Sequence, residues 1–168
     1  MTAIIIDAPP ERVWDEVIAF REIERPPSLA FRLGIAYPVS ASLTGTGVGA
    51  VRRCEFSTGA FVEPITLWDA PHRLGFDVAE QPAVLQEWSP YRTVYAPHLD
   101  GFFRSTRGEF RLTSLPGGRT LLEGSTWYTL EMHPRAYWTM ISDALLHRIH
   151  ERVLEQVKLQ AESPTPAG

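Results

Sequence analysis

The order of segments along this chain constrains its fold more than any single motif does. A β-branched segment, Ile4, Ile5 and Ile6, precedes Asp-Ala-Pro-Pro at residues 7–10. Proline suits the first turn of a helix, because the first amides of a helix have no partner within it. About ninety residues of strand-like sequence follow, and a segment free of proline and glycine over residues 137–160 closes the chain. This order predicts an α+β fold in which an antiparallel sheet curls around one long helix and leaves a cavity beside it.

Both helical segments have an apolar face. Val13, Trp14 and Val17 share one side of the first. The apolar residues of the closing segment recur at helical spacing: Trp138, Ile141, Leu145, Ile149, Val153 and Val157. Six more strands are expected between the two helices, over residues 37–43, 50–57, 61–69, 73–80, 106–114 and 120–131. If residues 115–119 form a five-residue loop, the last two strands make a hairpin in which Arg111 faces Glu123 and Glu109 faces Ser125. A short second helix or a turn fits residues 22–33, since Pro26 and Pro27 break any helix that runs on from the first.

Length and composition fit one globular domain. The chain has 168 residues, of which 44% are hydrophobic and 21% charged, so it is long enough to bury a core. We expect a single domain over residues 1–162 and a disordered tail over residues 163–168. A net charge of -4 disfavours nucleic acid as a partner. Neither a phosphate-binding loop nor a dinucleotide motif is present, so no cofactor is expected.

The sequence also bears on location and assembly. No segment has the length and hydrophobicity of a transmembrane helix, and the N-terminus lacks the pattern of a signal peptide. A single cysteine, Cys54, cannot form an internal disulfide, which agrees with a reducing compartment. We therefore expect a cytoplasmic protein that is a monomer or a homodimer.

Four motifs carry a resemblance to a known superfamily. They are Ile-Asp-Ala-Pro-Pro-Glu-Arg-Val-Trp-Asp-Glu-Val at residues 6–17, Gly-Val-Gly at 47–49, Val-Glu-Pro-Ile-Thr at 62–66 and Asp-Ala-Pro-His-Arg-Leu at 69–74. With the long final helix, their order resembles the SRPBCC superfamily of START-like lipid carriers, polyketide cyclase/dehydrase-like proteins and the birch-pollen-allergen type. The resemblance implies a helix-grip fold, in which a seven-stranded curved antiparallel sheet wraps around the C-terminal helix and two short N-terminal helices support it. Carriers, sensors and enzymes share that fold, so function has to be argued from the site.

The space between the closing helix and the sheet is the expected ligand site. Alternation in the strands and the apolar face of the helix predict that it is bordered by Leu74, Phe76, Phe110, Leu112, Tyr128, Ile141 and Leu145. We expect it to bind or transport a hydrophobic small molecule of lipid, polyketide or isoprenoid kind. The alternative is an enzyme of polyketide cyclase, aromatase or dehydratase type. In that case the residues that polarise a carbonyl or move a proton would come from Arg53, Glu55, Glu109 and Tyr128.

One row of charged side chains could face either the cavity or the solvent, and only in the cavity could it bind a ligand or take part in acid–base chemistry. Arg107, Glu109 and Arg111 alternate along one strand, with Phe110 and Leu112 on its other face. The row is either the outer, solvated face of the sheet or a polar patch inside the cavity. The outer face is favoured, because charged side chains are seldom buried.

Residues 90–107 are too long for a hairpin turn and rich in aromatic residues. We favour a flap over the cavity mouth, in which Phe102 and Phe103 contact the ligand. The same segment also fits a loop packed on the protein body, and a third interpretation has the two rings in peripheral contact with a membrane or a protein surface.

A third group of polar residues lies on the closing helix. Asp143, His147 and His150 have the spacing of metal ligands on one helical face. That face points away from the apolar stripe of the helix, so we expect it to be solvated or to contact another subunit, and no metal site is predicted.

Overall fold

The computed structural model describes residues 1–27, 29–32, 34–84 and 102–163. Seven strands form one antiparallel sheet in the order β1-β7-β6-β5-β4-β3-β2. The strands are β1 (Thr2–Ile6), β2 (Pro38–Thr44), β3 (Val51–Phe56), β4 (Gly59–Asp69), β5 (Arg73–Asp77), β6 (Phe103–Leu115) and β7 (Arg119–Leu130). The helices are α1 (Pro10–Ile18), α2 (Leu29–Arg32) and α3 (Arg135–Glu162).

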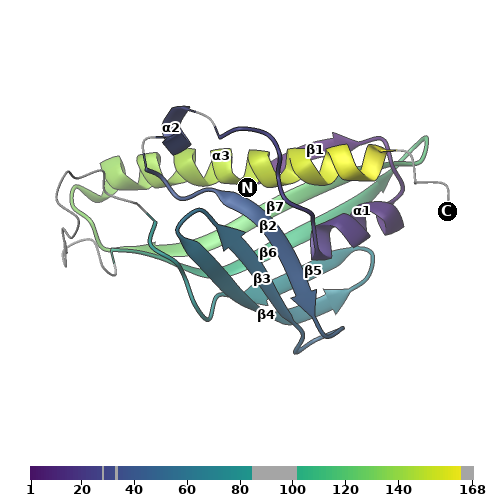
Figure 1. The fold of residues 1–168 in the computed structure, drawn as a ribbon, viewed down its shortest axis with the longest axis horizontal. Helices are drawn as coiled ribbons and strands as arrows, with labels where there is room; N and C mark the ends of the chain where they lie inside the picture. The colour runs from purple at the N-terminus through teal and green to yellow at the C-terminus, as the bar shows by residue number, and fades with distance from the viewer. Residues whose placement is uncertain (28, 33, 85–101, 164–168) are drawn as a thin grey trace.

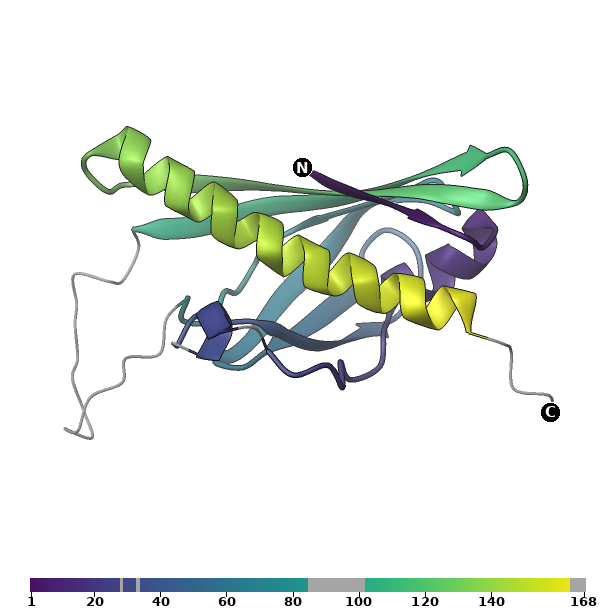
Figure 2. The same ribbon diagram turned by 90° about the horizontal axis from the view of Figure 1, so that it is seen from above.

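The long helix α3 lies inside the curl of the sheet. Figure 1 shows it running along one face, with α1 near its C-terminal end. From above, the β6–β7 hairpin follows one side of α3, and β2 to β5 curve away from the hairpin toward the other (Figure 2). A seven-stranded curled sheet closed by a long C-terminal helix is thus confirmed.

The expectation of two N-terminal helices was wrong in its second member. Only α1, with nine residues, is more than one helical turn, and its buried residues include Val13, Trp14 and Val17. The segment α2 is a single turn of four residues. Proline residues precede this turn and Gly34 follows it at a φ of 100°, so the chain has no room for a longer helix.

The β6–β7 hairpin has the register predicted from its loop. Arg111 pairs with Glu123 and Glu109 with Ser125, around a turn in which Gly117 and Gly118 adopt φ values of 82° and 71°. Strand β6 begins at Phe103, so residues 103–107 are strand and not loop. Residues 85–101, which hold most of the expected flap, and the tail at 164–168 lie outside the described residues.

The contacts of α3 with the sheet change along the helix. Its C-terminal part buries Val153, Leu154, Val157 and Ala161 in the core, and the buried Arg152 donates to the carbonyl oxygen of Pro38 in β2. Farther toward the N-terminus of the helix, polar side chains contact polar side chains of β1 and β7. The Thr2 hydroxyl lies 2.8 Å from Nδ1 of His147 and 3.3 Å from Nδ1 of His150.

The expected orientation of Asp143, His147 and His150 was only partly right. Asp143 and His147 are exposed, as expected of a solvated face, but all three side chains also contact the sheet. The Thr126 hydroxyl lies 2.8 Å from Nε2 of His150, and the Tyr128 hydroxyl donates to Oδ1 of Asp143 at 2.6 Å. These three helix residues face the sheet because threonine and tyrosine side chains of β1 and β7 supply hydrogen-bonding partners there. No group of three or more possible metal ligands occurs in the part of the chain that the structure describes.

The contact around His150 makes stability depend on pH. Burial, with smaller effects from the N-terminal amine and His147, lowers the pKa of His150 from 6.5 to about 4. Between these values the unfolded chain takes up a proton that the folded protein resists, so stability is lost as the pH falls through this window. His150→Gln keeps a hydrogen-bonding side chain without the titration. Urea unfolding should then show a smaller loss of stability between about pH 7 and about pH 5 in this variant than in the wild type.

The exposed His72 provides the matched control, since His72→Gln should leave the pH dependence of the wild type unchanged. An equal loss of stability in the wild type and in His150→Gln would contradict this interpretation.

Candidate functional site

A buried ion pair lies on the concave face of the sheet. Arg52 of β3 and Glu63 of β4 are cross-strand partners, and Nη1 of Arg52 donates to the Glu63 carboxylate. Their side chains are 2% and 8% exposed. Charges this far from water persist only when they are paired, so each residue depends on the other.

Aromatic rings surround the guanidinium. Its central carbon lies 5.8 Å from the centre of the Phe20 ring and 5.6 Å from those of Phe76 and Phe110, within the range of cation–π attraction. Gly108 makes room for one of them, because a Cβ at this position would lie 2.4 Å from the Phe76 ring. A charged group is thus held in an otherwise apolar interior.

One donor of this group has no partner. Nε of Arg52 is buried and makes no hydrogen bond within the described residues. Leaving a buried donor unpaired costs about 1–3 kcal/mol. The guanidinium also interacts with the Cys54 thiol, and Nε is the atom of the buried pair that remains able to donate to an acceptor on a bound molecule.

The charges of the pair respond to burial and to each other. Burial raises the pKa of the Glu63 carboxyl, and the attraction of Arg52 offsets only part of that rise. Burial alone would lower the pKa of Arg52, but the charge interactions and hydrogen bonds with Glu63 and Cys54 together outweigh it, so the pKa is raised and the guanidinium keeps its proton. Burial also raises the pKa of the neighbouring Cys54 to about 12, which leaves a neutral thiol and no nucleophile.

Most of the polar candidates from the sequence lie on the outer face of the sheet. Arg53 and Glu55 are about half-exposed and pair with each other at 2.6 Å. Glu109 is covered by three arginines, whose Nη2 atoms lie 3.1–3.5 Å from its carboxylate oxygens: Arg73, Arg107 and Arg111. The charged row of β6 thus lies on the favoured outer face.

The apolar candidates fall into a packed group and a partly open group. Leu74, Phe76 and Leu112 are buried in the core, and Phe110 packs against them with its ring centre 6.0 Å from that of Phe76. The others are half-buried: Phe102, Phe103, Tyr128, Ile141 and Leu145. Within this second group, the rings of Phe103 and Tyr128 stack with their centres 4.8 Å apart.

Sequence reasoning missed Arg52 and Glu63, although a signal was present. In β3, Arg52 alternates in phase with Cys54, which is buried. In β4, Glu63 stands between Phe61 and Ile65 at the spacing of one face. A charged residue in phase with apolar ones on each of two adjacent strands predicts a buried ion pair.

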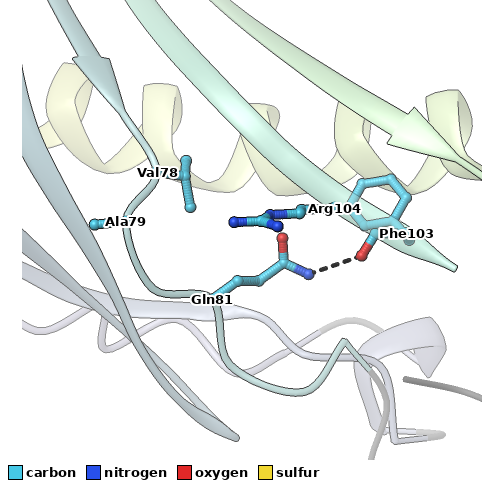
Figure 3. A pocket seen from close by; sticks show the side chains of 5 residues that line it. All are labelled: Val78, Ala79, Gln81, Phe103 and Arg104. Carbon is cyan, nitrogen blue, oxygen red and sulfur yellow. Dashed lines mark hydrogen bonds between the residues drawn. The ribbon is translucent and has the colours of Figure 1, made fainter. Parts of the chain in front are cut away.

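A pocket of about 250 Å³ lies where two strands of the sheet separate. Pairing of β5 with β6 ends at Asp77 and Arg107, and the chain beyond β5 turns to β4, where Glu80 pairs with Val62. The pocket between them is lined by Val78, Ala79, Gln81, Phe103 and Arg104 (Figure 3). Of the residues predicted to border the ligand site, Phe103 lines this pocket.

The side chain of Gln81 bridges the separation. Its Nε2 donates to the carbonyl oxygen of Phe103 at 3.1 Å, and its Oε1 accepts from the amide of Ser105 at 2.8 Å (Figure 3). These bonds replace the missing main-chain pairing, so the start of β6 is held at a defined distance from the end of β5.

Comparison with known proteins identifies relatives in fold. No protein-family model and no curated protein matches this chain. The Zhui aromatase/cyclase from Streptomyces sp. R1128 superposes with a TM-score of 0.58 at 15% identity, over 95% of this chain and 90% of that one. A conserved protein from Geobacillus kaustophilus superposes with a TM-score of 0.56 at 12% identity, over 95% of this chain and 91% of that one. A protein from Nitrosospira multiformis superposes with a TM-score of 0.51 at 21% identity, over 96% of this chain and 94% of that one.

These similarities show a shared fold over nearly the full length of each chain. The neighbours include a polyketide aromatase/cyclase and proteins solved by structural genomics, and the curled sheet fits the helix-grip description. Among the helices that the structure describes, none combines the length and the apolar character needed to cross a membrane.

The buried pair makes a clear prediction for stability. Glu63→Leu leaves Arg52 charged and unpaired in the core, which should cost about 3–5 kcal/mol of unfolding free energy. Replacing both residues, as Arg52→Met with Glu63→Leu, removes both charges and should cost less than the single change. Urea unfolding of the three proteins measures the difference.

The exposed pair of the same strand provides the control. Glu55→Leu breaks the solvated contact with Arg53 and should cost under about 1 kcal/mol. Equal losses of unfolding free energy for Glu63→Leu and Glu55→Leu would show that the buried ion pair contributes no more to stability than the exposed one.

Proposed function

We propose that this protein binds a hydrophobic small molecule between α3 and the concave face of the sheet, with Arg52 as the polar anchor. The supporting observation is the buried Nε of Arg52, which has no acceptor among the described residues. A ligand oxygen at this position would recover the hydrogen bond that the protein leaves unmade. Glu63 keeps the guanidinium oriented while Nε donates.

The surroundings of Arg52 indicate the ligand class. Phe20, Phe76 and Phe110 offer aromatic faces, and burial leaves little room for a strongly hydrated group. A flat, largely apolar molecule with a carbonyl or hydroxyl oxygen suits this combination. Aromatic polyketides and similar ring compounds belong to this class.

The pocket at the separation of β5 and β6 supports a route for the ligand. Val78 lines the pocket and follows Phe76 by two residues. It lies one residue beyond β5, but its amide still donates to the carbonyl oxygen of Thr106 in β6 at 3.0 Å, so alternation puts both side chains on one face. The Phe76 ring would then stand between the pocket and Arg52. Rotation of this ring would connect the two, and Gly108 leaves the backbone of β6 clear of it.

We also propose that the chain is a member of the SRPBCC superfamily, which agrees with binding of a hydrophobic molecule. The fold and the similarity to the Zhui aromatase/cyclase support it, and so do the sequence motifs near α1 and β4. A binding protein and an enzyme can share this scaffold.

A cyclase-type enzyme is the second candidate, favoured by the same buried donor. Arg52 Nε could donate to a substrate carbonyl and polarise it by stabilising negative charge on its oxygen. Such a donor gains strength in a site that excludes water. On this proposal Arg52 is the catalytic residue and Glu63 is its positioning residue.

Binding of two neutral probes tests the proposed anchor. Acetylnaphthalene carries a carbonyl oxygen, whereas ethylnaphthalene has nearly the same shape without one. The wild type should bind the ketone about tenfold more tightly, the gain of one hydrogen bond to a charged donor. The variant with Arg52→Met and Glu63→Leu should bind both equally, as measured by calorimetric titration. No preference for the ketone in the wild type, or the same preference in the double variant, would contradict the proposal.

Turnover separates the binder from the enzyme. A short poly-β-ketone chain should be bound but recovered unchanged if the protein is a carrier. If it is an enzyme, ring-closed products should form, and the double variant should form them on the order of a hundredfold more slowly. Mass spectrometry of the products and of any molecule extracted with the purified protein makes the measurement.

A further inference from the structure

The pocket at the separation of β5 and β6 combines an apolar wall with one cation. Val78, Ala79 and Phe103 supply the apolar groups, and Arg104 is the charged residue of the lining. Figure 3 shows its guanidinium extending across the opening, between β6 and the segment that holds Val78 and Ala79.

Arg104 differs from most arginines of the sheet, and from Arg119, whose Nε donates to the carbonyl oxygen of Pro116. Arg53, Arg73, Arg107 and Arg111 each pair with a carboxylate of the sheet. Arg104 makes neither an ion pair nor a side-chain hydrogen bond with any residue in the described ranges. Its five N–H donors are therefore available to a ligand.

The walls of the pocket are held in place before any ligand binds. Both polar atoms of the Gln81 amide bond to the backbone of β6, at Phe103 and Ser105. The Phe103 ring stacks on Tyr128, whose hydroxyl is bonded to Asp143 of α3. A preorganised pocket loses little entropy on binding, which favours a specific ligand over a random surface contact.

We propose that this pocket recognises a carboxylate or other anionic group on an otherwise apolar ligand, with Arg104 as the pairing cation. The inference rests on the proposed function, which supplies the apolar character of the ligand. What it adds is that the ligand carries a negative charge. A volume of about 250 Å³ holds a small part of a ligand, in keeping with recognition of one end group. Arg104 would hold the anion in the opening, and Phe103 with Val78 would contact the adjoining apolar atoms.

The test compares naphthoate with naphthamide, its uncharged isostere, by calorimetric titration at neutral pH and low salt. Wild-type protein should prefer the acid, and Arg104→Gln should weaken naphthoate binding by about three- to tenfold while naphthamide binding stays within about twofold. Arg104→Lys keeps the charge and should retain most of the preference. Arg119→Gln alters an exposed arginine at the far end of the hairpin and should change neither affinity.

Two results would overturn the inference. The first is an equal affinity of the wild type for acid and amide, and the second is an equal effect of Arg104→Gln on both. Either result would leave the proposed function uncontradicted, provided that acetylnaphthalene still binds the wild type more tightly than the variant with Arg52→Met and Glu63→Leu. Absence of binding by both naphthalene probes and by the ketone would contradict the inference and the proposed function together. Chemical shift changes at Val78, Ala79 and Gln81 on adding naphthoate should locate the site.

Discussion

The ion pair between Arg52 and Glu63 constrains the architecture more than any other contact. The two charges sit on adjacent strands, and each is tolerated in the core because the other faces it. A slip of one residue between β3 and β4 would place one charge among aromatic rings without its partner and the other in solvent. The pair therefore specifies the strand register at the cost of burying charge. It also places a cation on the concave face, where an apolar ligand would lie.

The attachment of α3 complements this arrangement. Its C-terminal part closes the core with aliphatic residues and with Arg152, which donates to two main-chain carbonyl oxygens. Farther toward its N-terminus the helix is held by hydrogen bonds to Thr2, Thr126 and Tyr128. Directional polar contacts fix the helix at a distance from the sheet that side-chain packing alone would not define. The half-buried Ile141 and Leu145 belong to this part of the helix, next to Phe103 and Tyr128 in the partly open group. A ligand site is more readily accommodated here than in the closely packed end.

The sequence predicted the elements that depend on local pattern. Alternation and turn residues were enough for the seven strands, for the hairpin register that pairs Arg111 with Glu123, and for the buried face of α1. Features that depend on two distant segments were missed. Arg53 and Glu55 were predicted as candidates in place of Arg52, although Arg52 alternates in phase with Cys54. The partner that makes Arg52 tolerable in the core, Glu63, comes from the neighbouring strand, and the pattern of β3 alone does not show it. The polar face of α3 was assigned to solvent because helical periodicity cannot show that β1 and β7 offer hydroxyl groups to it.

Observation of the Arg52 Nε–H proton is the most direct test of whether this buried donor is unpaired in the free protein and bonds to a ligand. Side-chain nitrogen NMR can follow this proton in the free protein and during titration with acetylnaphthalene. A buried donor without a water partner should exchange slowly with solvent, and its resonance should move downfield when the ketone oxygen binds. Rapid exchange in the free protein would show that water already occupies the position. A resonance that stays unchanged while the ketone binds would show that Arg52 is not the anchor.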